Sequence, residues 1–327
     1  MEKEVCELIK SLKQKDKFVI MLAPSFVVDF SYPSIICELK KAGFDKVVEL
    51  TFGAKMINRE YHDQLKTSKK LIISSVCPGV VEFISRKYPK YRSNLISVDS
   101  PMSAMAKICK KTYPNHKIVF VSPCNFKKVE AKTKENKKNI DFVINYIELK
   151  QVIFKCVNKK EKTCKLNVKN ARFDKFYNDY TKIYPVSGGL SRTLGINSMT
   201  CLGFLNTPKF GLSAYELKKG VRTNTNFAVS KTADLNHIIL KKETKIIDGI
   251  KEVEKFLKTP DKTIRFLDVT FCKGGCIGGP CINSKLSIDK RKKKVLNYLK
   301  IAKKEDIPNS DLGVIQKARN ISFLRNK

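Results

Sequence analysis

Short apolar runs alternate with helix-like segments along this chain. A continuous apolar run of the buried-strand type occupies residues 17–22, and further strands are predicted over residues 46–50, 71–75, 117–121, 141–145 and 264–271. Segments with helical character lie between them. Strands that alternate with helices predict parallel β-α-β units. The expected fold is therefore α/β, with two lobes built on parallel β-sheets and flanked by helices.

The 327-residue chain is long enough for two lobes with real cores, and 42% of its residues are hydrophobic. We expect a first α/β lobe over residues 1–122, a second over 123–284 and a basic helical extension over 285–327. Residues 130–139 are predicted to form an exposed lysine-rich loop, and a helix is predicted near 246–257. No apolar run is long enough to cross a bilayer and no signal peptide is recognisable, so a cytoplasmic location is expected.

Four cysteines follow strand-like runs and lie in turns rich in Gly, Pro or Ser. They are Cys77, Cys124, Cys272 and Cys276. In parallel α/β folds, ligands bind beyond the carboxyl ends of the strands. A [4Fe–4S] cluster needs four thiolates, and the glycines between Cys272 and Cys276 allow the backbone to curl closely around an inorganic core. The pattern therefore predicts an iron–sulfur site.

Disulfide bonds and a structural zinc site explain these cysteines less well than an iron–sulfur site does. The chain has 11 Cys, an odd number spread over its length, which argues against a disulfide framework. A structural zinc site usually has two paired cysteine knuckles, whereas Cys77 and Cys124 are unpaired and far apart. Cys281 is a candidate fifth site residue. The remaining cysteines are expected to be ordinary core or surface thiols; they are Cys6, Cys37, Cys109, Cys156, Cys164 and Cys201.

The formal net charge is +34, which raises the question of a nucleic-acid partner. Most of this charge comes from Lys scattered over every segment, whereas Arg is the preferred residue for phosphate and base recognition. Nucleic acid is therefore an unlikely main partner. Alternatively, the positive charge would attract an acidic protein, such as an electron carrier.

From about residue 23 to residue 280, the chain resembles the C-terminal H-cluster domain of the [FeFe] (iron-only) hydrogenase large subunit. The matching signatures are, in order, Ala23-Pro24-Ser25, Gly43-Phe44-Asp45, Phe52-Gly53-Ala54, Cys77-Pro78, Ser100-Pro101, Pro123-Cys124 with Lys127 and Glu130, Ser187-Gly188-Gly189, and Cys272 with Cys276 and its glycines. The resemblance implies an α/β fold with the iron–sulfur site in the cleft between two lobes.

The resemblance also implies a cofactor and roles for individual residues. Four cysteines would hold a [4Fe–4S] cluster, and Cys276 would bridge it to a diiron unit with CO, cyanide and dithiolate ligands. Lys127 matches the lysine that hydrogen-bonds a cyanide ligand, and the catalytic Glu130 is retained. The remaining implied cofactor-binding residues would line the diiron pocket; they are Pro24, Gly188 and Gly189.

Two departures from the family pattern bear on activity. The proton-shuttling cysteine is replaced by Val76, and the acidic residues after the Phe-Gly-Ala motif are only partly retained, as Glu60 followed by Tyr61. Valine cannot carry a proton. The expected function is reversible H2 oxidation and proton reduction with weak turnover, or H2 sensing. A non-catalytic iron–sulfur protein for electron transfer or assembly is the alternative, and a nucleic-acid-associated protein with a structural cluster is a weaker third.

Two kinds of partner follow from this expectation. No ferredoxin-like cysteine motif precedes the domain in the sequence. Electrons are therefore expected to come from a separate ferredoxin-like carrier. Installation of the diiron unit would require dedicated maturation enzymes.

Overall fold

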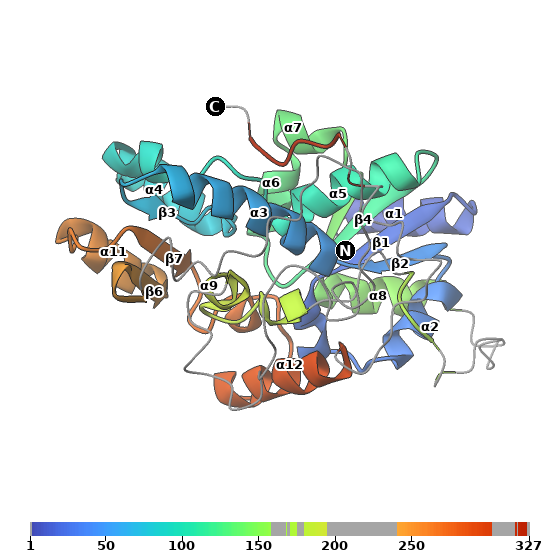
Figure 1. Cartoon of the computed structure of the whole chain (residues 1–327). Coiled ribbons are helices and arrows are strands. Elements are labelled where there is room, and N and C mark those ends of the chain that lie inside the picture. Colours follow the sequence, from blue (N-terminus) through green and yellow to red (C-terminus); the bar gives the residue numbers. More distant parts are fainter. Residues whose placement is uncertain are drawn as a thin grey trace, which may run out of the picture.

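The chain folds into two β-sheets of parallel strands, with helices packed on their faces (Figure 1). The structure, a computed structural model, describes residues 2–157, 168, 171–174, 180–194, 241–302, 318 and 320–325. The first sheet has the order β2 (Lys46–Glu49), β1 (Phe18–Leu22), β4 (Lys117–Ser122), β5 (Phe142–Asn145). The second has the order β3 (Ile72–Ile73), β7 (Phe266–Thr270), β6 (Thr244–Asp248). Every pairing between these strands is parallel, which confirms the predicted α/β class.

Strand β1 is buried along its whole length and supplies both faces of the first sheet with core residues. Val19 and Met21 join the core under α3 (Thr51–Thr67) and α5 (Pro101–Thr112). Their neighbours along the strand, such as Ile20, join the opposite core. That core lies under α1 (Lys3–Lys13), α2 (Ser34–Lys41) and α8 (Tyr146–Cys156). Side chains that alternate between two buried faces explain the continuous apolar run.

Strand β7 connects the second sheet to the rest of the interior. Phe266 joins the core under α3, whereas Leu267 joins a core formed with α4 (Pro78–Lys87) and α11 (Ile250–Lys258). Each sheet draws strands from both sides of residue 122, because β3 pairs with β7 and β5 pairs with β4. The division into three segments at residues 122 and 284 stays a prediction.

Short helices replace the loop that was predicted over residues 130–139. The structure has α6 (Phe126–Ala131) and α7 (Lys134–Lys137) here. Asn136 is buried, and its Nδ2 donates to the carbonyl oxygen of Glu130 at 3.0 Å. This hydrogen bond anchors the lysine-rich segment at one buried amide. The prediction was wrong about the loop, because short helices form here, but most residues of 132–138 are exposed as predicted.

The predicted helix over residues 246–257 is a strand followed by a helix. Strand β6 pairs with β7 through Ile246 and Asp268, and α11 starts only at Ile250. Gly249 separates the two with a φ of +92°, a conformation that glycine adopts readily. Pairing with β7 outweighs the helical pattern, as tertiary context often does.

The basic segment after residue 285 contains a helix, α12 (Ile288–Ala302), which lies along the lower edge of the molecule in Figure 1. It packs against the 3-10 helices η1 (Pro24–Val28) and η4 (Tyr180–Ile183) through buried residues that include Tyr298. The other short helices described are η2 (Pro89–Asn94), α9 (Gly189–Thr193), η6 (Lys241–Glu243) and η7 (Cys276–Gly278). None of the described helices combines the length and apolar character that a membrane crossing requires.

Acidification is expected to destabilise the fold through His62 on α3. Burial lowers the pKa of His62 to about 4, Lys66 acts in the same direction, and Asp63 opposes them. The unfolded chain, with a histidine pKa of about 6.5, takes up the proton first as the pH falls. Stability should therefore decrease between pH 6.5 and 4, by up to about 1.4 kcal/mol per pH unit.

Urea denaturation of the wild type and of His62→Gln at pH 7 and pH 5 measures this effect. The variant should lose less free energy of unfolding between the two pH values than the wild type. Equal losses would show that His62 does not titrate differently in the folded and unfolded chains.

Candidate metal centre

Cys77 lies where β3, the edge strand of the second sheet, leads into α4. It is the N-cap of that helix, and Pro78 occupies the first turn. Burial raises the pKa of the Cys77 thiol, and the backbone at Phe271 and Val80 opposes this rise. Backbone N–H groups near a metal-bound sulfur stabilise the thiolate and tune the potential of a cluster. The surroundings of Cys77 therefore suit a metal ligand.

Cys124 lies just beyond β4, the second strand from one edge of the first sheet. The Ser122 hydroxyl fixes the turn in which it lies, because it accepts from the Cys124 N–H at 3.1 Å and donates to the Cys124 carbonyl at 2.8 Å. The carboxyl end of a parallel strand is the usual location of a ligand site. Cys124 thus comes to the site from a different sheet than Cys77.

The turn between Cys272 and Cys276 is pressed against a second loop. Gly275 has a φ of +81°, and a Cβ atom there would lie 2.7 Å from the Pro185 carbonyl oxygen and 2.8 Å from the Ser187 nitrogen. Only glycine allows both the backbone conformation and so close an approach. The paired glycines of this motif therefore shape the cysteine turn and dock it on residues 185–187.

Direct contacts connect all three cysteine motifs. A Cβ on Gly279 would lie 2.5 Å from the carbonyl oxygen of Pro123, and one on Gly79 would lie 2.8 Å from the ring of Phe126. The rings of Phe126 and Phe271 lie 5.0 Å apart, centroid to centroid, directly over Gly79. Each motif thus carries a glycine or an aromatic ring that packs on another. This packing holds the four cysteines in fixed relative positions.

The four thiols lie within electrostatic reach of one another. Burial raises the pKa of Cys276 well above its usual range, and the thiols of Cys77, Cys124 and Cys272 each add to the rise. Burial also raises the pKa of Cys272 to about 11, with smaller contributions from Cys77, Cys124 and Cys281. The structure therefore brings together the four predicted ligands, with Cys281 beside them.

The side chain of Cys276 is exposed, yet the protein around it desolvates the thiol and raises its pKa. Four thiols that lie close together are the donor set of a [4Fe–4S] cluster.

Among the residues that the structure describes, no three Cys, His, Asp or Glu side chains form a group that could hold a single metal ion.

Lys127 and Glu130 both belong to α6, which lies near the thiols. The Lys127 ammonium contacts Glu130 Oε2 at 2.5 Å, and both side chains are almost fully buried. Against the larger effect of burial, the Lys127 charge lowers the pKa of both Cys77 and Cys276. Lys127 is therefore an interior cation that faces the cysteines, not one of the many surface lysines.

The three residues predicted to line the pocket lie close to the cysteine turn. Pro24 begins η1, which packs against η7, the short helix that starts at Cys276. Gly188 has a φ of +70° and leaves space for Ile246, while a Cβ on Gly189 would lie 2.4 Å from the Ile183 carbonyl oxygen. Packing of the loop accounts for both glycines. Contact with a diiron unit stays a prediction for all three residues.

Sequence reasoning missed two tyrosines near the site. The hydroxyl groups of Tyr146 and Ser25 are buried 2.5 Å apart. Burial raises the pKa of Tyr146 well above its usual range, with smaller contributions from the nearby thiols of Cys276 and Cys124. The hydroxyl of Tyr184 is buried without a hydrogen-bond partner among the described residues. Its place just before the glycine loop was the one signal available in the sequence; nothing marked Tyr146.

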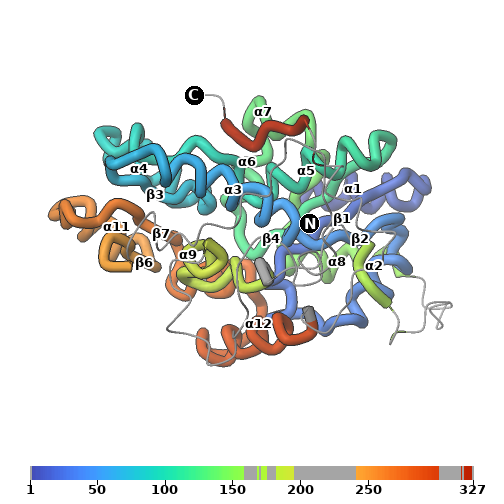
Figure 2. The backbone as a smooth tube through the Cα atoms, viewed as in Figure 1, coloured from blue at the N-terminus to red at the C-terminus, as the bar shows by residue number. Residues whose placement is uncertain are grey.

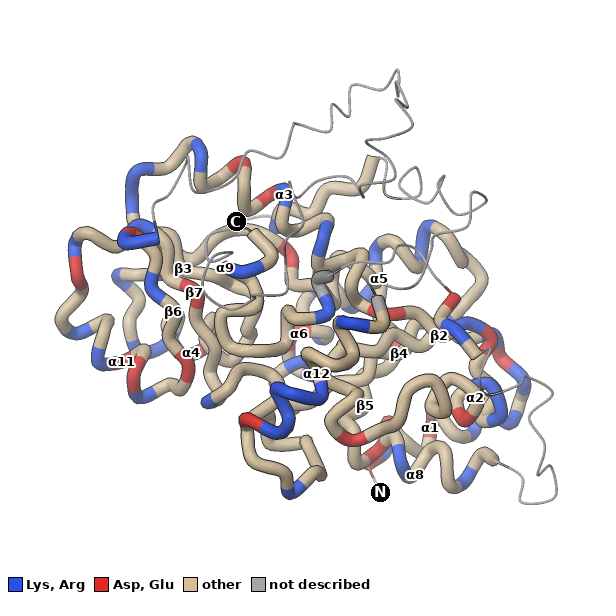
Figure 3. The backbone as a smooth tube through the Cα atoms, turned by 60° about the horizontal axis from the view of Figure 1, so that its bottom comes forward, with Lys and Arg blue, Asp and Glu red and all other residues tan. Residues whose placement is uncertain are grey.

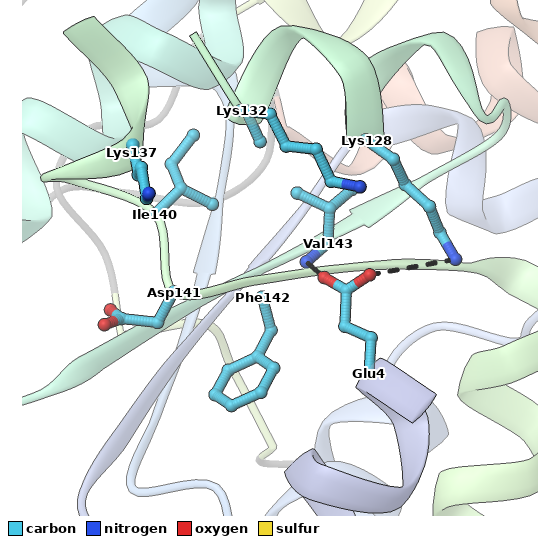
Figure 4. Close-up of a pocket in the computed structure, with 9 residues that line it drawn as sticks. Glu4, Lys128, Lys132, Lys137, Ile140, Asp141, Phe142 and Val143 are labelled. Atoms are coloured by element: carbon cyan, nitrogen blue, oxygen red, sulfur yellow. Dashed lines mark hydrogen bonds and ion pairs between the residues drawn. The ribbon is translucent and has the colours of Figure 1, made fainter. Parts of the chain in front are cut away.

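A pocket of about 410 Å³ lies apart from these residues, beside α6, α7 and β5 (Figure 4). Lys128 lines it and contacts Glu148 Oε1 at 2.7 Å and Glu4 Oε2 at 4.0 Å. None of the predicted site residues lines this pocket. The neighbouring residues Lys127 and Lys128 therefore face different environments, one at the cysteines and one among carboxylates near the N-terminus.

Comparison with known proteins agrees with this geometry. Residues 16–280 match the family described as iron only hydrogenase large subunit, C-terminal domain. Iron hydrogenase 1 of Clostridium pasteurianum is 26% identical over 274 residues, which are 77% of this chain and 46% of that protein. The NADP-reducing hydrogenase subunit HndD of Solidesulfovibrio fructosivorans is 25% identical over 329 residues, covering 84% of this chain and 52% of that protein. The chain thus spans about half the length of these relatives.

A third relative has a different name. The cytosolic Fe-S cluster assembly factor NAR1 of Kluyveromyces lactis is 29% identical over 102 residues, covering 30% of this chain and 22% of that protein. Among solved structures, the [FeFe]-hydrogenase HydA(deltaEFG) has a TM-score of 0.57 at 16% identity and covers 97% of this chain and 93% of its own. A HydA1 variant of Chlamydomonas reinhardtii has a TM-score of 0.58 at 15% identity, with the same coverage. The chain belongs to the family of the iron only hydrogenase large subunit, C-terminal domain, a family of hydrogenase-like iron–sulfur domains.

Proposed function

We propose that this chain holds one [4Fe–4S] cluster through the thiolates of Cys77, Cys124, Cys272 and Cys276. The observation that carries the proposal is the convergence of these thiols from both sheets. The backbone at Phe271 and Val80 and the charge of Lys127 oppose the effect of burial on the Cys77 pKa, and so favour the thiolate form that iron requires. The rigid packing of the three motifs holds these ligands in place before metal arrives.

We further propose that Cys276 bridges the cluster to a diiron unit with CO, cyanide and dithiolate ligands, which when bound would supply the hydrogen chemistry. The buried Lys127 ammonium would donate a charge-assisted hydrogen bond to an anionic ligand. Pro24 and the loop at Gly188 and Gly189 would border the unit and exclude water. The chain would then be an oxidoreductase that turns over hydrogen slowly, or a hydrogen sensor.

Slow turnover follows from two side chains near the site. Val76 is partly buried and packs against the core under α3, and its side chain has no group that can transfer a proton. The Tyr61 hydroxyl accepts a hydrogen bond from the Ser75 N–H at 3.0 Å, and burial raises the pKa of this phenol well above its usual range. Proton delivery on this side of the site is therefore poor.

The same two residues favour a second candidate function. A protein that holds only the [4Fe–4S] cluster needs no proton path, and it would serve electron transfer or cluster assembly. One relative is called an Fe-S cluster assembly factor. Val76 and Tyr61 are the observations that support this alternative.

An infrared spectrum separates the two candidates. The protein would be purified without oxygen from a host that has the maturation enzymes. Bands from iron-bound CO and cyanide are the expected result for a hydrogenase-like protein. Their absence, together with a [4Fe–4S] signal, would leave electron transfer or assembly as the function.

The surface charge supports an acidic electron-donor protein as partner. Lys and Arg positions are spread along nearly every element of the backbone in Figure 3, in keeping with the net charge of +34. Opposite charge speeds the encounter of two proteins, and this effect weakens with salt. We propose that a separate ferredoxin-like carrier docks on this basic surface, in the cytoplasm, and that maturation enzymes install the diiron unit.

Replacement of Lys127 with Met is expected to lower the midpoint potential of the cluster. Loss of a buried positive charge near Cys77 and Cys276 stabilises the oxidised form relative to the more negative reduced form. The shift should be on the order of 50 mV, which corresponds to about 1 kcal/mol for a one-electron couple. A redox titration followed by electron paramagnetic resonance measures it.

Lys128→Met is the matched control for this prediction. It removes the same charge one residue away, from a side chain that pairs with Glu148 instead of facing the thiols. Its midpoint potential should stay within about 15 mV of the wild-type value, because the charge is farther away and already paired. Equal shifts in both variants would mean that Lys127 has no special place at the site.

A further inference from the structure

The C-terminal segment of the chain lies against the site region and not in solvent. Residues 320–325, red in Figure 2, run beside α5 and α7. The Asp99 N–H donates to the Phe323 carbonyl at 2.8 Å, and the Arg325 N–H donates to the Ser97 carbonyl at 3.1 Å. Lys107 adds a hydrogen bond from its ammonium to the Ser322 carbonyl at 2.9 Å. The segment therefore pairs with residues 97–99 as a short antiparallel strand would.

This pairing brings the side chain of Arg325 to the interior. Its Nη2 contacts Glu130 Oε1 at 3.0 Å, and the Arg325 side chain is only 23% exposed. The other oxygen of the Glu130 carboxylate contacts the Lys127 ammonium at 2.5 Å. Ser103 Oγ also lies 3.5 Å from Glu130 Oε1. One buried carboxylate thus lies between two cations.

The charges of this triad do not cancel. Burial by itself raises the pKa of Glu130, but Lys127 and Arg325 outweigh it and hold that pKa below its usual value, so the carboxylate stays ionised at neutral pH. A Lys127–Glu130 pair alone would be neutral overall. With Arg325 the triad carries one net positive charge, and this charge lies beside the thiols. Because Arg325 also pairs with Glu130, the carboxylate does not fully cancel the charge of Lys127, which acts on Cys77 and Cys276.

The other charged groups near Arg325 are paired with each other. Asp99 contacts the Lys107 ammonium at 2.6 Å, and its side chain is 3% exposed. Arg325 therefore meets Glu130 as its nearest carboxylate partner among the described residues.

We infer that Arg325, carried by the C-terminal segment, is a positioning residue that holds Glu130 and thereby directs the charge of Lys127 toward the group bound at the cysteines. This inference rests on the proposed iron–sulfur cluster. The cysteine motifs end at residue 280, so the inference adds a site residue far outside them. It also makes the C-terminal segment part of the metal centre.

The test compares Arg325→Gln and Arg325→Lys with the wild type. Arg325→Gln should keep the wild-type iron content and shift the midpoint potential of the cluster to a more negative value. Arg325→Lys should restore most of the wild-type potential, because it keeps the charge. When Glu130→Gln is already present, adding Arg325→Gln should shift the potential less than Arg325→Gln does in the wild type, because Arg325 acts through Glu130. An unchanged potential in Arg325→Gln with a full cluster would overturn the inference.

A second measurement does not depend on the cluster. Hydrogen exchange of the α6 amides should become faster in Arg325→Gln than in the wild type, with α8 amides unchanged as the internal control. If the wild type binds no cluster, the proposed function fails, while faster exchange confined to α6 still supports the contact between Arg325 and Glu130. Equal exchange in α6 would show that Arg325 does not hold this helix, and would overturn the inference by itself.

Discussion

Cys276→Ala is expected to abolish stable cluster binding. The other three thiols all act on the pKa of Cys276 in addition to burial. Loss of an outer-shell partner typically costs roughly 10–100-fold in metal affinity, and loss of a direct ligand should cost more. Iron and sulfide per chain, assayed after anaerobic reconstitution and desalting, should fall at least about tenfold.

Cys281→Ala is the matched control. Cys281 is buried next to the site, and its thiol donates to Asn125 Oδ1 at 3.4 Å. The change removes a neighbouring thiol while leaving the four proposed ligands intact. Iron content should stay near the wild-type value. A loss in Cys281→Ala as large as that in Cys276→Ala would require a different ligand set.

Val76→Cys is expected to raise hydrogen turnover in protein that carries the diiron unit. Val76 directly precedes Cys77, and its carbonyl oxygen lies 3.5 Å from the Lys127 ammonium. A thiol at this place would supply the general acid that valine lacks. General acid–base catalysis typically contributes about 10²–10⁴-fold, so a gain of about 100-fold is expected. Hydrogen/deuterium exchange and proton reduction with a chemical reductant both measure it.

Val76→Ala separates proton transfer from packing. It removes side-chain volume at the same place but adds no proton donor, so it should leave turnover unchanged. A gain in both variants would point to better access of substrate to the pocket. No gain in Val76→Cys, with the infrared bands present, would show that the missing cysteine is not the main defect, and Tyr61 would become the next position to change.

Much of the fold could be predicted because its signals are local. The continuous apolar run at residues 17–22 is buried on both faces of the first sheet, and the structure places β1 at Phe18–Leu22. Helix α5 carries a local start signal in Ser100, which caps it by accepting from the Ser103 N–H. Strand periodicity and capping residues act within a few positions of the sequence. Such elements are therefore readable without knowledge of the tertiary structure.

The errors have a common physical cause. Strand β6 exists because Ile246 and its neighbours pair with β7, and α7 is anchored by the hydrogen bond from Asn136 to Glu130. Both depend on partners that the local sequence does not reveal. No helix or strand was predicted over residues 200–245, and this segment lies outside the described residues, apart from its end at 241–245.

The four cysteines could be predicted because their signals are local, whereas a site residue that depends on a distant partner could not. Turn residues around each cysteine marked Cys77, Cys124, Cys272 and Cys276, and the structure brings all four thiols together. Arg325 carried no such signal, because it reaches Glu130 only through the pairing of residues 320–325 with residues 97–99. Its role depends on a contact between segments almost 200 positions apart in the sequence.

The central claim is that Cys77, Cys124, Cys272 and Cys276 hold one [4Fe–4S] cluster, and a Mössbauer spectrum of the chain reconstituted with ⁵⁷Fe tests it most directly. The account predicts about four iron and four sulfide ions per chain and the spectrum of a [4Fe–4S] cluster. Protein that retains only a single iron or zinc ion, without sulfide, would contradict it.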